Sequence, residues 1–228
     1  WENKWRLRQG KPAIAPIYTT AETEQALKLR RALDYGVQQE VAPGVRLTYH
    51  DAGHILGAAI VELEVDDHHL TRRLVFSGDL GNGCSPLMHS PSILDSADAV
   101  MLESTYGDRD HRCSEDTLDE LADILQQAHR DGGNVLIPAF AVGRTQDLIF
   151  HLGRFYQQGR LPQQAVFLDS PMAIRANGIY NHYIDQFNPQ DFALLAGKGI
   201  RRTEDWLPVM SCTASAEESM AINRIKSG

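Results

Sequence analysis

A two-residue alternation of apolar and polar side chains is the feature that most constrains the fold of this chain. Residues 45–49 alternate in this way, and the same period returns over residues 60–65. Successive side chains of a strand point to opposite faces of its sheet, so both segments are expected to form half-buried strands. Residues 66–69 are expected to form the turn of a hairpin whose second strand covers residues 70–76. The first half of the chain is therefore expected to be rich in strands.

The pattern changes after Asp95, where short apolar segments begin to alternate with segments of helical period. Such alternation is typical of a parallel sheet flanked by helices. The chain is therefore expected to be of the α/β class and to hold two architectures, with a boundary between residues 107 and 113. The other strands are expected over residues 15–18, 99–102, 135–137 and 166–168. One helix is expected to be capped by Thr19 or Thr20 and to continue to about Tyr35, and a second to be capped by Ser114 and to end at Gly132 and Gly133. Two more are expected to begin near residue 148 and near Pro171.

Charge and cysteine content exclude some classes of protein. A formal net charge of −8 argues against a generally basic coat for nucleic acid, although a few Arg or Lys residues on one face are enough to bind phosphates. The three cysteines lack CxxC spacing, so neither a disulfide framework nor a cysteine-based zinc site is expected. This cysteine content instead favours a reducing, cytoplasmic compartment. The cysteines are Cys84, Cys113 and Cys212, and the basic clusters are Arg6, Arg8 and Lys11, then Arg109, His111 and Arg112, then Arg201 and Arg202.

A membrane partner is not expected. No apolar run approaches the ~20 residues that a membrane helix needs, and no signal peptide is visible. The chain begins with Trp1 rather than Met and ends at Gly228 without a cap typical of a chain end, so we expect it to be a piece of a longer protein.

His54 and Asp79 are candidate metal ligands. His54 lies in a glycine-flanked turn, and Asp79 directly follows an apolar strand. Neutral imidazole and carboxylate are usual ligands of a catalytic zinc. A carboxylate can also bridge two cations, and paired cations can activate a water for a phosphoryl displacement. The alternatives are an exposed or structural histidine and an ordinary turn aspartate.

Glu103 is a candidate catalytic residue because it follows a predicted strand and precedes a turn of small residues. Such a carboxylate could orient or protonate a catalytic histidine, and the alternative is an acid that faces solvent at a strand end. His50 and Asp51 lie close to His54 in the sequence and are interpreted as supporting or structural residues.

Two turns in the second half are candidate phosphate sites. Residues 138–144 and 168–173 each link a predicted strand to a predicted helix. Backbone amides at a helix start can bind phosphate, which makes Arg144 and Ser170 candidate substrate contacts. Helix capping, and for Arg144 a structural ion pair, are equally favoured alternatives.

Five runs of this sequence resemble, in the same order, those of the β-CASP nucleases of the metallo-β-lactamase superfamily. The chain resembles in particular the bacterial and archaeal RNA-degrading members, which are related to the eukaryotic endonuclease that cleaves the 3′ end of pre-mRNA. Any single run would be weak, but five in order are specific. The runs are Thr48 to Ala59, Phe76 to Asn82, Glu103 to Arg112, Asn134 to Gln146 and Phe167 to Ala173.

The resemblance implies a fold. Residues 1–107 would form part of the αββα sandwich of a metallo-β-lactamase domain. Residues 108–228 would form part of a β-CASP domain, with a mostly parallel sheet flanked by helices. RNA would bind in the cleft between the two domains.

The resemblance also implies a site and an activity. His54 would bind one zinc ion, Asp79 would bridge two and take part in catalysis, and Glu103 would be a catalytic acid. The whole protein would be a zinc-dependent ribonuclease that hydrolyses single-stranded RNA with a metal-activated water. A homodimer is one possible assembly. The residues expected to contact RNA phosphate are Arg109, Arg144 and Ser170.

The chain lacks other motifs that the resemblance requires. The H-x-H-x-D-H run would lie before Trp1, and the late histidines after a G-S-G-M-like turn would lie beyond Gly228. His54 and Asp79 are then too few for a catalytic zinc site, which needs three protein groups. We therefore expect this chain alone to bind no zinc and to be inactive.

Two other functions remain open. The first is an inactive scaffold in an RNA-processing complex, which the joint presence of His54, Asp79 and Glu103 disfavours. The second is a metallo-hydrolase of small substrates, which the strand-helix segment after Glu103 disfavours.

Overall fold

A computed structural model describes residues 2–83, 85–163, 165–190, 193 and 202–225. The chain divides into two compact units, Trp1–Asp34 and Tyr35–Gly228. Among the described residues, no helix is both long and apolar enough to cross a membrane. Four residues named above, Trp1, Cys84, Arg201 and Gly228, lie outside the described residues.

The first unit holds two short helices, α1 (Glu2–Arg8) and α2 (Thr20–Lys28). The prediction that Thr19 caps the second helix is confirmed. Its hydroxyl accepts a hydrogen bond from the N–H of Glu22, whose carboxylate accepts the N–H of Thr19 at 2.7 Å. Two predictions are wrong: the helix ends at Lys28 rather than near Tyr35, and residues 15–18 form no strand. A strand needs a neighbour for its N–H and C=O groups, and no described strand pairs with residues 15–18.

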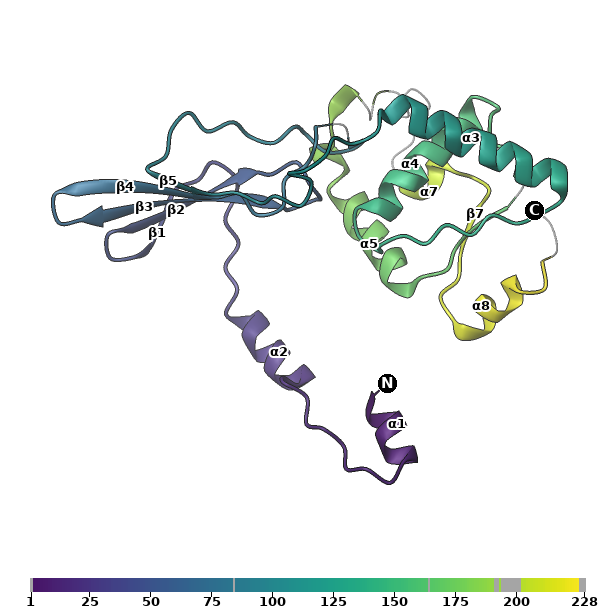
Figure 1. Cartoon of the computed structure of the whole chain (residues 1–228), viewed down its shortest axis with the longest axis horizontal. Coiled ribbons are helices and arrows are strands. Elements are labelled where there is room, and N and C mark those ends of the chain that lie inside the picture. Colours follow the sequence, from purple (N-terminus) through teal and green to yellow (C-terminus); the bar gives the residue numbers. More distant parts are fainter. Residues whose placement is uncertain (1, 84, 164, 191–192, 194–201, 226–228) are drawn as a thin grey trace. The chain divides into compact units, whose positions relative to one another are not determined.

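The second unit begins with a five-stranded sheet in the order β1-β2-β3-β4-β5 (Figure 1). All of its neighbouring strands are antiparallel except β4 and β5, which are parallel. The expected hairpin is confirmed, because Asp67 pairs with Leu70 across the turn between β3 and β4. The strands are β1 (Gln39–Ala42), β2 (Val45–Asp51), β3 (Ala59–Asp67), β4 (Leu70–Phe76) and β5 (Ala99–Met101).

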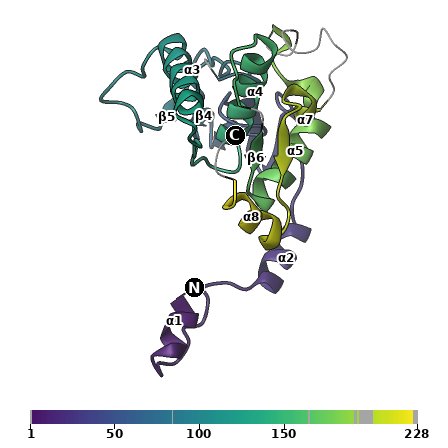
Figure 2. The same ribbon diagram turned by 90° about the vertical axis from the view of Figure 1, so that its right-hand side faces the viewer.

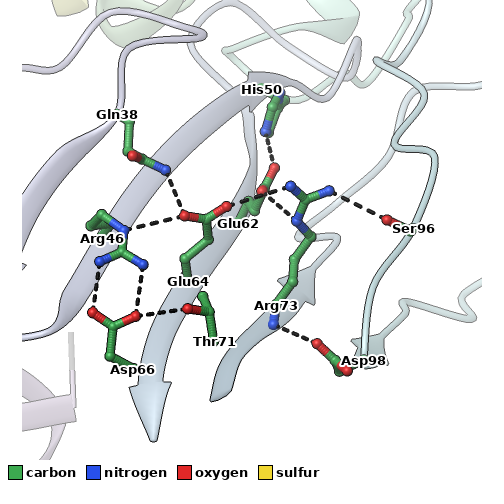
Figure 3. Close-up of polar contacts among 10 residues, drawn as sticks. All are labelled: Gln38, Arg46, His50, Glu62, Glu64, Asp66, Thr71, Arg73, Ser96 and Asp98. Carbon is green, nitrogen blue, oxygen red and sulfur yellow. Dashed lines mark hydrogen bonds and ion pairs between the residues drawn. The ribbon is translucent and has the colours of Figure 1, made fainter. Parts of the chain in front are cut away.

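Charged side chains form a network on one face of this sheet (Figure 3). Glu62 is 7% exposed and lies between an imidazole and a guanidinium group, with His50 Nε2 at 2.7 Å and Arg73 Nε at 3.0 Å from its carboxylate. Arg46 binds both carboxylate oxygens of Asp66, at 2.8 and 2.9 Å. The N–H of Arg73 donates to the Asp98 carboxylate at 2.8 Å, which fastens the segment before β5 to the sheet. His50, interpreted from the sequence as a supporting or structural residue, is thus hydrogen-bonded to Glu62 within the sheet.

The remaining chain is mostly helical and contains one pair of parallel strands, β6 and β7. Helices α4, α5 and α7 lie together in both ribbon views (Figure 1, Figure 2). The predicted helix starts near residue 148 and near Pro171 agree with the structure to within a turn, since α4 begins at Arg144 and α5 at Pro171. The elements are α3 (Ser114–Asp131), α4 (Arg144–Gln157), β6 (Val166–Leu168), α5 (Pro171–His182), the 3-10 helix η1 (Ile184–Gln186), α7 (Thr203–Trp206), β7 (Met210–Cys212) and α8 (Ala216–Ile222).

Two predictions in this half are wrong. Residues 135–137 form no strand; Leu136 is 92% exposed, and no described strand lies beside it to pair with its backbone. Ser114 does not cap α3 but is its first residue, and the N-cap position belongs to Cys113, whose side chain makes no capping hydrogen bond. At the other end the expected stop is confirmed, since Gly132 adopts a φ of +66°.

The largest buried side chains pack where the segment after β4 meets the helices. Trp206 and Phe150 are fully buried and meet edge to face, with ring centroids 5.9 Å apart. Leu87, from the segment between β4 and β5, is also fully buried in this cluster, and its carbonyl accepts the N–H of Asn188 at 3.0 Å. The sheet-side segment and the helices therefore share one core. Its buried members are Leu87, Ile149, Phe150, Tyr180, Phe187 and Trp206.

A largely buried carboxyl group lies at the same junction. Asp147 of α4 accepts a hydrogen bond from the Ser85 hydroxyl at 3.3 Å, and its carboxylate lies 3.9 Å from the Arg144 guanidinium. Burial raises the pKa of Asp147 to about 6, with Arg144 and Ser85 acting in the opposite direction. One turn further along α4, burial lowers the pKa of His151 to about 4, and the charges of Arg154 and Arg144 add to that effect.

Two backbone segments come into direct contact at Gly81 and Gly53. A Cβ atom on Gly81 would overlap the carbonyl group of Gly53 and lie 3.0 Å from the N atom of His54. The Gly81 N–H donates to the Ala52 carbonyl at 2.8 Å, and the Asp51 carboxylate accepts the Gly53 N–H at 2.8 Å. The turn after β2 and the turn after β4 are thus held together by main-chain atoms, and glycine is required at Gly81 for lack of space.

We predict that Gly81→Ala lowers the free energy of unfolding by about 1–3 kcal/mol, because the added methyl group must push the two turns apart. Urea unfolding followed by circular dichroism measures the change. Gly178→Ala is the matched control, since a methyl group added at this position of α5 would meet open space. The control is expected to be neutral or to stabilise by up to ~1 kcal/mol through helix propensity. Equal stability of Gly81→Ala and the wild type would contradict the close contact.

We predict that Asp147→Asn changes the pH dependence of stability. The pKa of Asp147 in the folded protein, about 6, lies above the ordinary value of roughly 3.9. The contribution of protonated Asp147 to the free energy of unfolding is therefore lost as pH rises between these two values. His151 acts oppositely: its folded pKa of about 4 is depressed, so stability is lost as pH falls through the window below roughly 6.5. Removing Asp147 leaves the His151 effect unopposed.

The variant should therefore gain stability more steeply than the wild type between pH 4 and pH 6. Urea unfolding at a series of pH values checks this. Asp123→Asn, on the exposed side of α3, is the control and should leave the profile unchanged. Identical profiles for Asp147→Asn and the wild type would show that Asp147 is not shielded from solvent.

Candidate metal and nucleic-acid site

The structure places His54 and Asp79 on the two turns that touch through Gly53 and Gly81. His54 lies between β2 and β3, and Asp79 lies just after β4. Both side chains are exposed. The main-chain contact brings together the two turns that carry the predicted ligands, although these turns are far apart in the sequence.

Glu103 is bound to the same pair of turns. One carboxylate oxygen accepts the N–H of Leu80, the residue after Asp79, at 3.0 Å. The other accepts the Thr105 hydroxyl at 2.7 Å and the Thr105 N–H at 3.2 Å. The N–H of Glu103 itself donates to the Ser77 hydroxyl at 2.9 Å. These bonds aim the carboxylate at the turn that carries Asp79.

The hydrogen bonds also set the protonation state of Glu103. Those from Thr105 and Leu80 hold the pKa of Glu103 below its usual value, and the charge of a protonated His54 acts in the same direction. Glu103 is therefore a carboxylate at neutral pH and is suited to accept a hydrogen bond or to orient a positively charged imidazole. His54, Asp79 and Glu103, identified separately in the sequence, are linked in the structure through the two touching turns and the hydrogen bonds of Glu103, and we call these three residues the cluster.

This cluster has the donor chemistry of a zinc site but too few donors. Imidazole nitrogen and carboxylate oxygen suit zinc. Within the described part of the chain, however, no three His, Cys, Asp or Glu side chains lie close enough together to hold a metal ion. Zinc sites use at least three protein groups, so the described residues do not by themselves fit a complete site.

Arg144 stands at the start of α4, close to the turn that carries His54. A Cβ atom on Gly143, the residue before it, would lie 2.6 Å from the side chain of Ile55, the residue after His54. Arg144 is exposed, and its guanidinium lies 3.9 Å from the Asp147 carboxylate. This is a loose i,i+3 contact, so both the predicted phosphate contact and its alternative, an ion pair, remain compatible with the geometry.

Ser170 and Arg109 lie outside this cluster's hydrogen bonds. The Ser170 hydroxyl accepts the N–H of Ala173 at 3.2 Å and caps α5, which corresponds to the capping alternative expected from the sequence. Arg109 is exposed in the segment between Glu103 and α3, and its guanidinium lies 5.2 Å from the centre of the Tyr106 ring. Neither residue is joined by a described hydrogen bond to His54, Asp79 or Glu103.

The residues that shape the loop before α4 were not predicted from the sequence. Gln146 is fully buried, its amide oxygen accepts the Gly143 N–H at 2.8 Å, and its amide nitrogen donates to Asn177 at 2.7 Å. The Thr145 hydroxyl donates to the Phe140 carbonyl at 2.7 Å. The spacing of Gly143 and Gln146 matches a helix-start pattern and could have been recognised, whereas the partner Asn177 could not.

Known proteins resemble this chain over most of its length. A model of the Beta-Casp domain matches residues 145–228. The "Ribonuclease TTHA0252" of Thermus thermophilus is 38% identical over 211 residues, covering 92% of this chain and 46% of the relative. The "RNase J-like protein" of Methanocaldococcus jannaschii is 29% identical over 180 residues, covering 78% of this chain and 42% of the relative.

A third relative carries a different name. The "Transcription termination factor FttA" of Methanothermobacter thermautotrophicus is 33% identical over 166 residues, covering 72% of this chain and 26% of the relative. The chain thus spans less than half the length of these curated relatives. The domain match and the similarity over most of the chain agree with each other: the chain belongs to the β-CASP family of the metallo-β-lactamase superfamily.

Proposed function

We propose that the whole protein is a zinc-dependent ribonuclease that hydrolyses phosphodiester bonds of RNA. The names of two relatives, a ribonuclease and an RNase J-like protein, support an RNA-cleaving activity. The observation that carries the proposal is the main-chain contact of Gly81 with Gly53, which joins the turn of His54 to the turn of Asp79, to which Glu103 is hydrogen-bonded.

In this proposal His54 and Asp79 supply part of a binuclear zinc site, with Asp79 as the bridging carboxylate. Two zinc ions are expected in the whole protein, with further ligands from outside this chain. Glu103 contributes as an ionised carboxylate that orients an imidazole, since its pKa lies below the usual value. The described residues of this chain supply too few ligands for a complete metal site.

RNA is the proposed partner, in single-stranded form. With a formal net charge of −8, the chain must bind phosphate locally, and exposed Arg144 beside the His54 turn is best placed to do so. Arg109 is a second candidate because it follows Glu103 closely. Ser170 is the weakest of the three predicted phosphate contacts, since its hydroxyl already caps α5.

The remaining proposals concern organisation and location. We propose that residues 1–107 belong to a metallo-β-lactamase domain and residues 108–228 to a β-CASP domain. The core shared by Leu87 and the helices would then be part of the contact between these domains. A cytoplasmic location and a homodimer are also proposed, on the cysteine content and the family resemblance respectively.

We predict that this 228-residue chain retains almost no zinc. The chain would be treated with chelator, reloaded with zinc, desalted and measured by elemental mass spectrometry. Near-zero zinc, together with no cleavage of single-stranded RNA, is expected because two donors do not complete a site. About two zinc ions per chain, lost in both His54→Ala and Asp79→Ala, would show that other residues or a second copy complete the site.

In the whole protein, we predict that Glu103→Gln lowers kcat for RNA cleavage by about 10- to 100-fold, a range typical for loss of a group that orients a metal ligand. The amide keeps the size of the side chain but loses the charge that faces His54. Glu115→Gln, in the exposed first turn of α3, is the control. If the unmodified protein binds RNA without cleaving it, the inactive scaffold is supported instead, and cleavage of small esters alone would support a small-substrate metallo-hydrolase.

A further inference from the structure

Three exposed side chains just after Glu103 pack against one another, and we call this group the Tyr106 stack: Tyr106, Arg109 and His111. The rings of Tyr106 and His111 have centroids 4.1 Å apart and are tilted by 46°. The Arg109 guanidinium lies 5.2 Å from the centre of the Tyr106 ring. Tyr106 is 50% exposed, so a large aromatic side chain is held at the surface with a cation and a second ring beside it.

The local backbone holds this arrangement in place. The Gly107 N–H donates to the Ser104 carbonyl at 3.0 Å and closes a tight turn around Tyr106. A Cβ atom on Gly107 would lie 3.3 Å from the Ser104 carbonyl oxygen, so the turn is closely packed. Contact with Arg109 and His111 further limits the Tyr106 ring, so a ligand would meet an aromatic surface that is already ordered.

The cation in the stack is not neutralised by a carboxylate. Within the described residues, no Asp or Glu oxygen lies within the 4.0 Å of Arg109 that defines an ion pair. The neighbouring Arg112 differs, since it is paired with Glu120 at 2.7 Å. Arg109 therefore keeps its charge available to a phosphate, which Arg112 does not.

The stack also lies next to the proposed catalytic cluster. Thr105, the residue before Tyr106, donates both its hydroxyl and its N–H to the Glu103 carboxylate. A nucleotide that stacks on Tyr106 would thus lie beside the residue that is hydrogen-bonded to Glu103. Surfaces that bind single-stranded nucleic acid combine exposed aromatic side chains with basic groups. The Tyr106 stack has both, and it lies close to the proposed phosphodiester-cleaving site.

We propose that the Tyr106 stack is a binding site for unpaired bases of single-stranded RNA, with a base on the aromatic side chains and Arg109 on an adjacent phosphate. The identity of the ligand rests on the proposed ribonuclease function, whereas the site itself rests on the geometry of the three side chains. Duplex RNA does not offer its base faces, so the site selects unpaired RNA. Bases of every type have a stacking face, so little sequence preference is expected.

The test measures binding of a fluorescein-labelled single-stranded RNA of about ten nucleotides, within the usual site size of such surfaces, to the 228-residue chain by fluorescence anisotropy. Tyr106→Ala should weaken binding by about 5- to 150-fold, the range for loss of one base-stacking contact. Tyr106→Phe should bind like the wild type, because it keeps the ring. Arg109→Gln should reduce the dependence of log affinity on log salt by about one unit.

Tyr183→Ala is the matched control. Tyr183 is 42% exposed and also lies against a histidine ring, that of His182 at 4.8 Å, but it is at the end of α5 and makes no described contact with an arginine. Its replacement should leave RNA affinity unchanged. Circular dichroism of each variant confirms that the fold is kept, which is expected because residues 104–113 are exposed.

Three results would overturn the site: wild-type affinity in Tyr106→Ala, equal losses in Tyr106→Ala and Tyr183→Ala, or no binding of single-stranded RNA by the chain. Equally tight, Tyr106-dependent binding of duplex RNA would also overturn it. Cleavage by the whole protein is a separate measurement. If RNA binding needs Tyr106 but the whole protein does not cleave RNA, the ribonuclease function is refuted and the binding site is kept. If the whole protein cleaves RNA but Tyr106→Ala binds RNA as tightly as the wild type, the binding site is refuted and the ribonuclease function is kept.

Discussion

The contact between Gly81 and Gly53 is the constraint on which the candidate site depends. Main-chain atoms of the two turns touch where any side chain on Gly81 would collide with a carbonyl group. The hydrogen bond from Gly81 to Ala52 and the bond from Gly53 to Asp51 hold this geometry from both sides. Because the turns are fixed by backbone rather than by flexible side chains, His54 and Asp79 are positioned by the sheet itself.

The sheet can fix these turns because its own register is firmly set. Apolar residues alternate along β2 and β3, and a slip of one residue would turn every one of them to the other face. The charged network around Glu62, Arg73 and Arg46 adds a second restraint, since these partners meet only in the observed register. Breaking such a network leaves a buried charge unpaired, which costs more than the pairing gains.

The helical part meets the sheet-side segment through two kinds of contact. Leu87 enters the core of Phe150 and Trp206, which supplies apolar burial. Gly143 lies against Ile55, and Ser85 donates to Asp147, which bring the start of α4 to the turn of His54. Arg144, the first residue of α4, thereby follows directly on the contact with the turn of His54.

Local patterns in the sequence were sufficient for much of this structure. The period of two predicted the strands of the sheet, and Thr19, Gly132 and Pro171 correctly marked helix ends, because these signals act over a few residues. The strands at residues 15–18 and 135–137 failed because a strand also needs a neighbour, and no short segment of sequence shows whether one is there. His54, Asp79 and Glu103 were recognised by residue type and position at strand ends.

The sequence by itself determined where the apolar and polar residues of the strands alternate, and it identified which residues are candidates for chemistry. Only the tertiary structure decided which of these residues meet: Glu103 with the turn of Asp79, Arg144 with the turn of His54, and Tyr106 with Arg109 and His111. It also decided that Ser170 caps a helix and that Asp147 is shielded from water. The physical reason is that capping and alternation depend on neighbours in the chain, whereas burial and clustering depend on contacts between segments that are distant in the sequence.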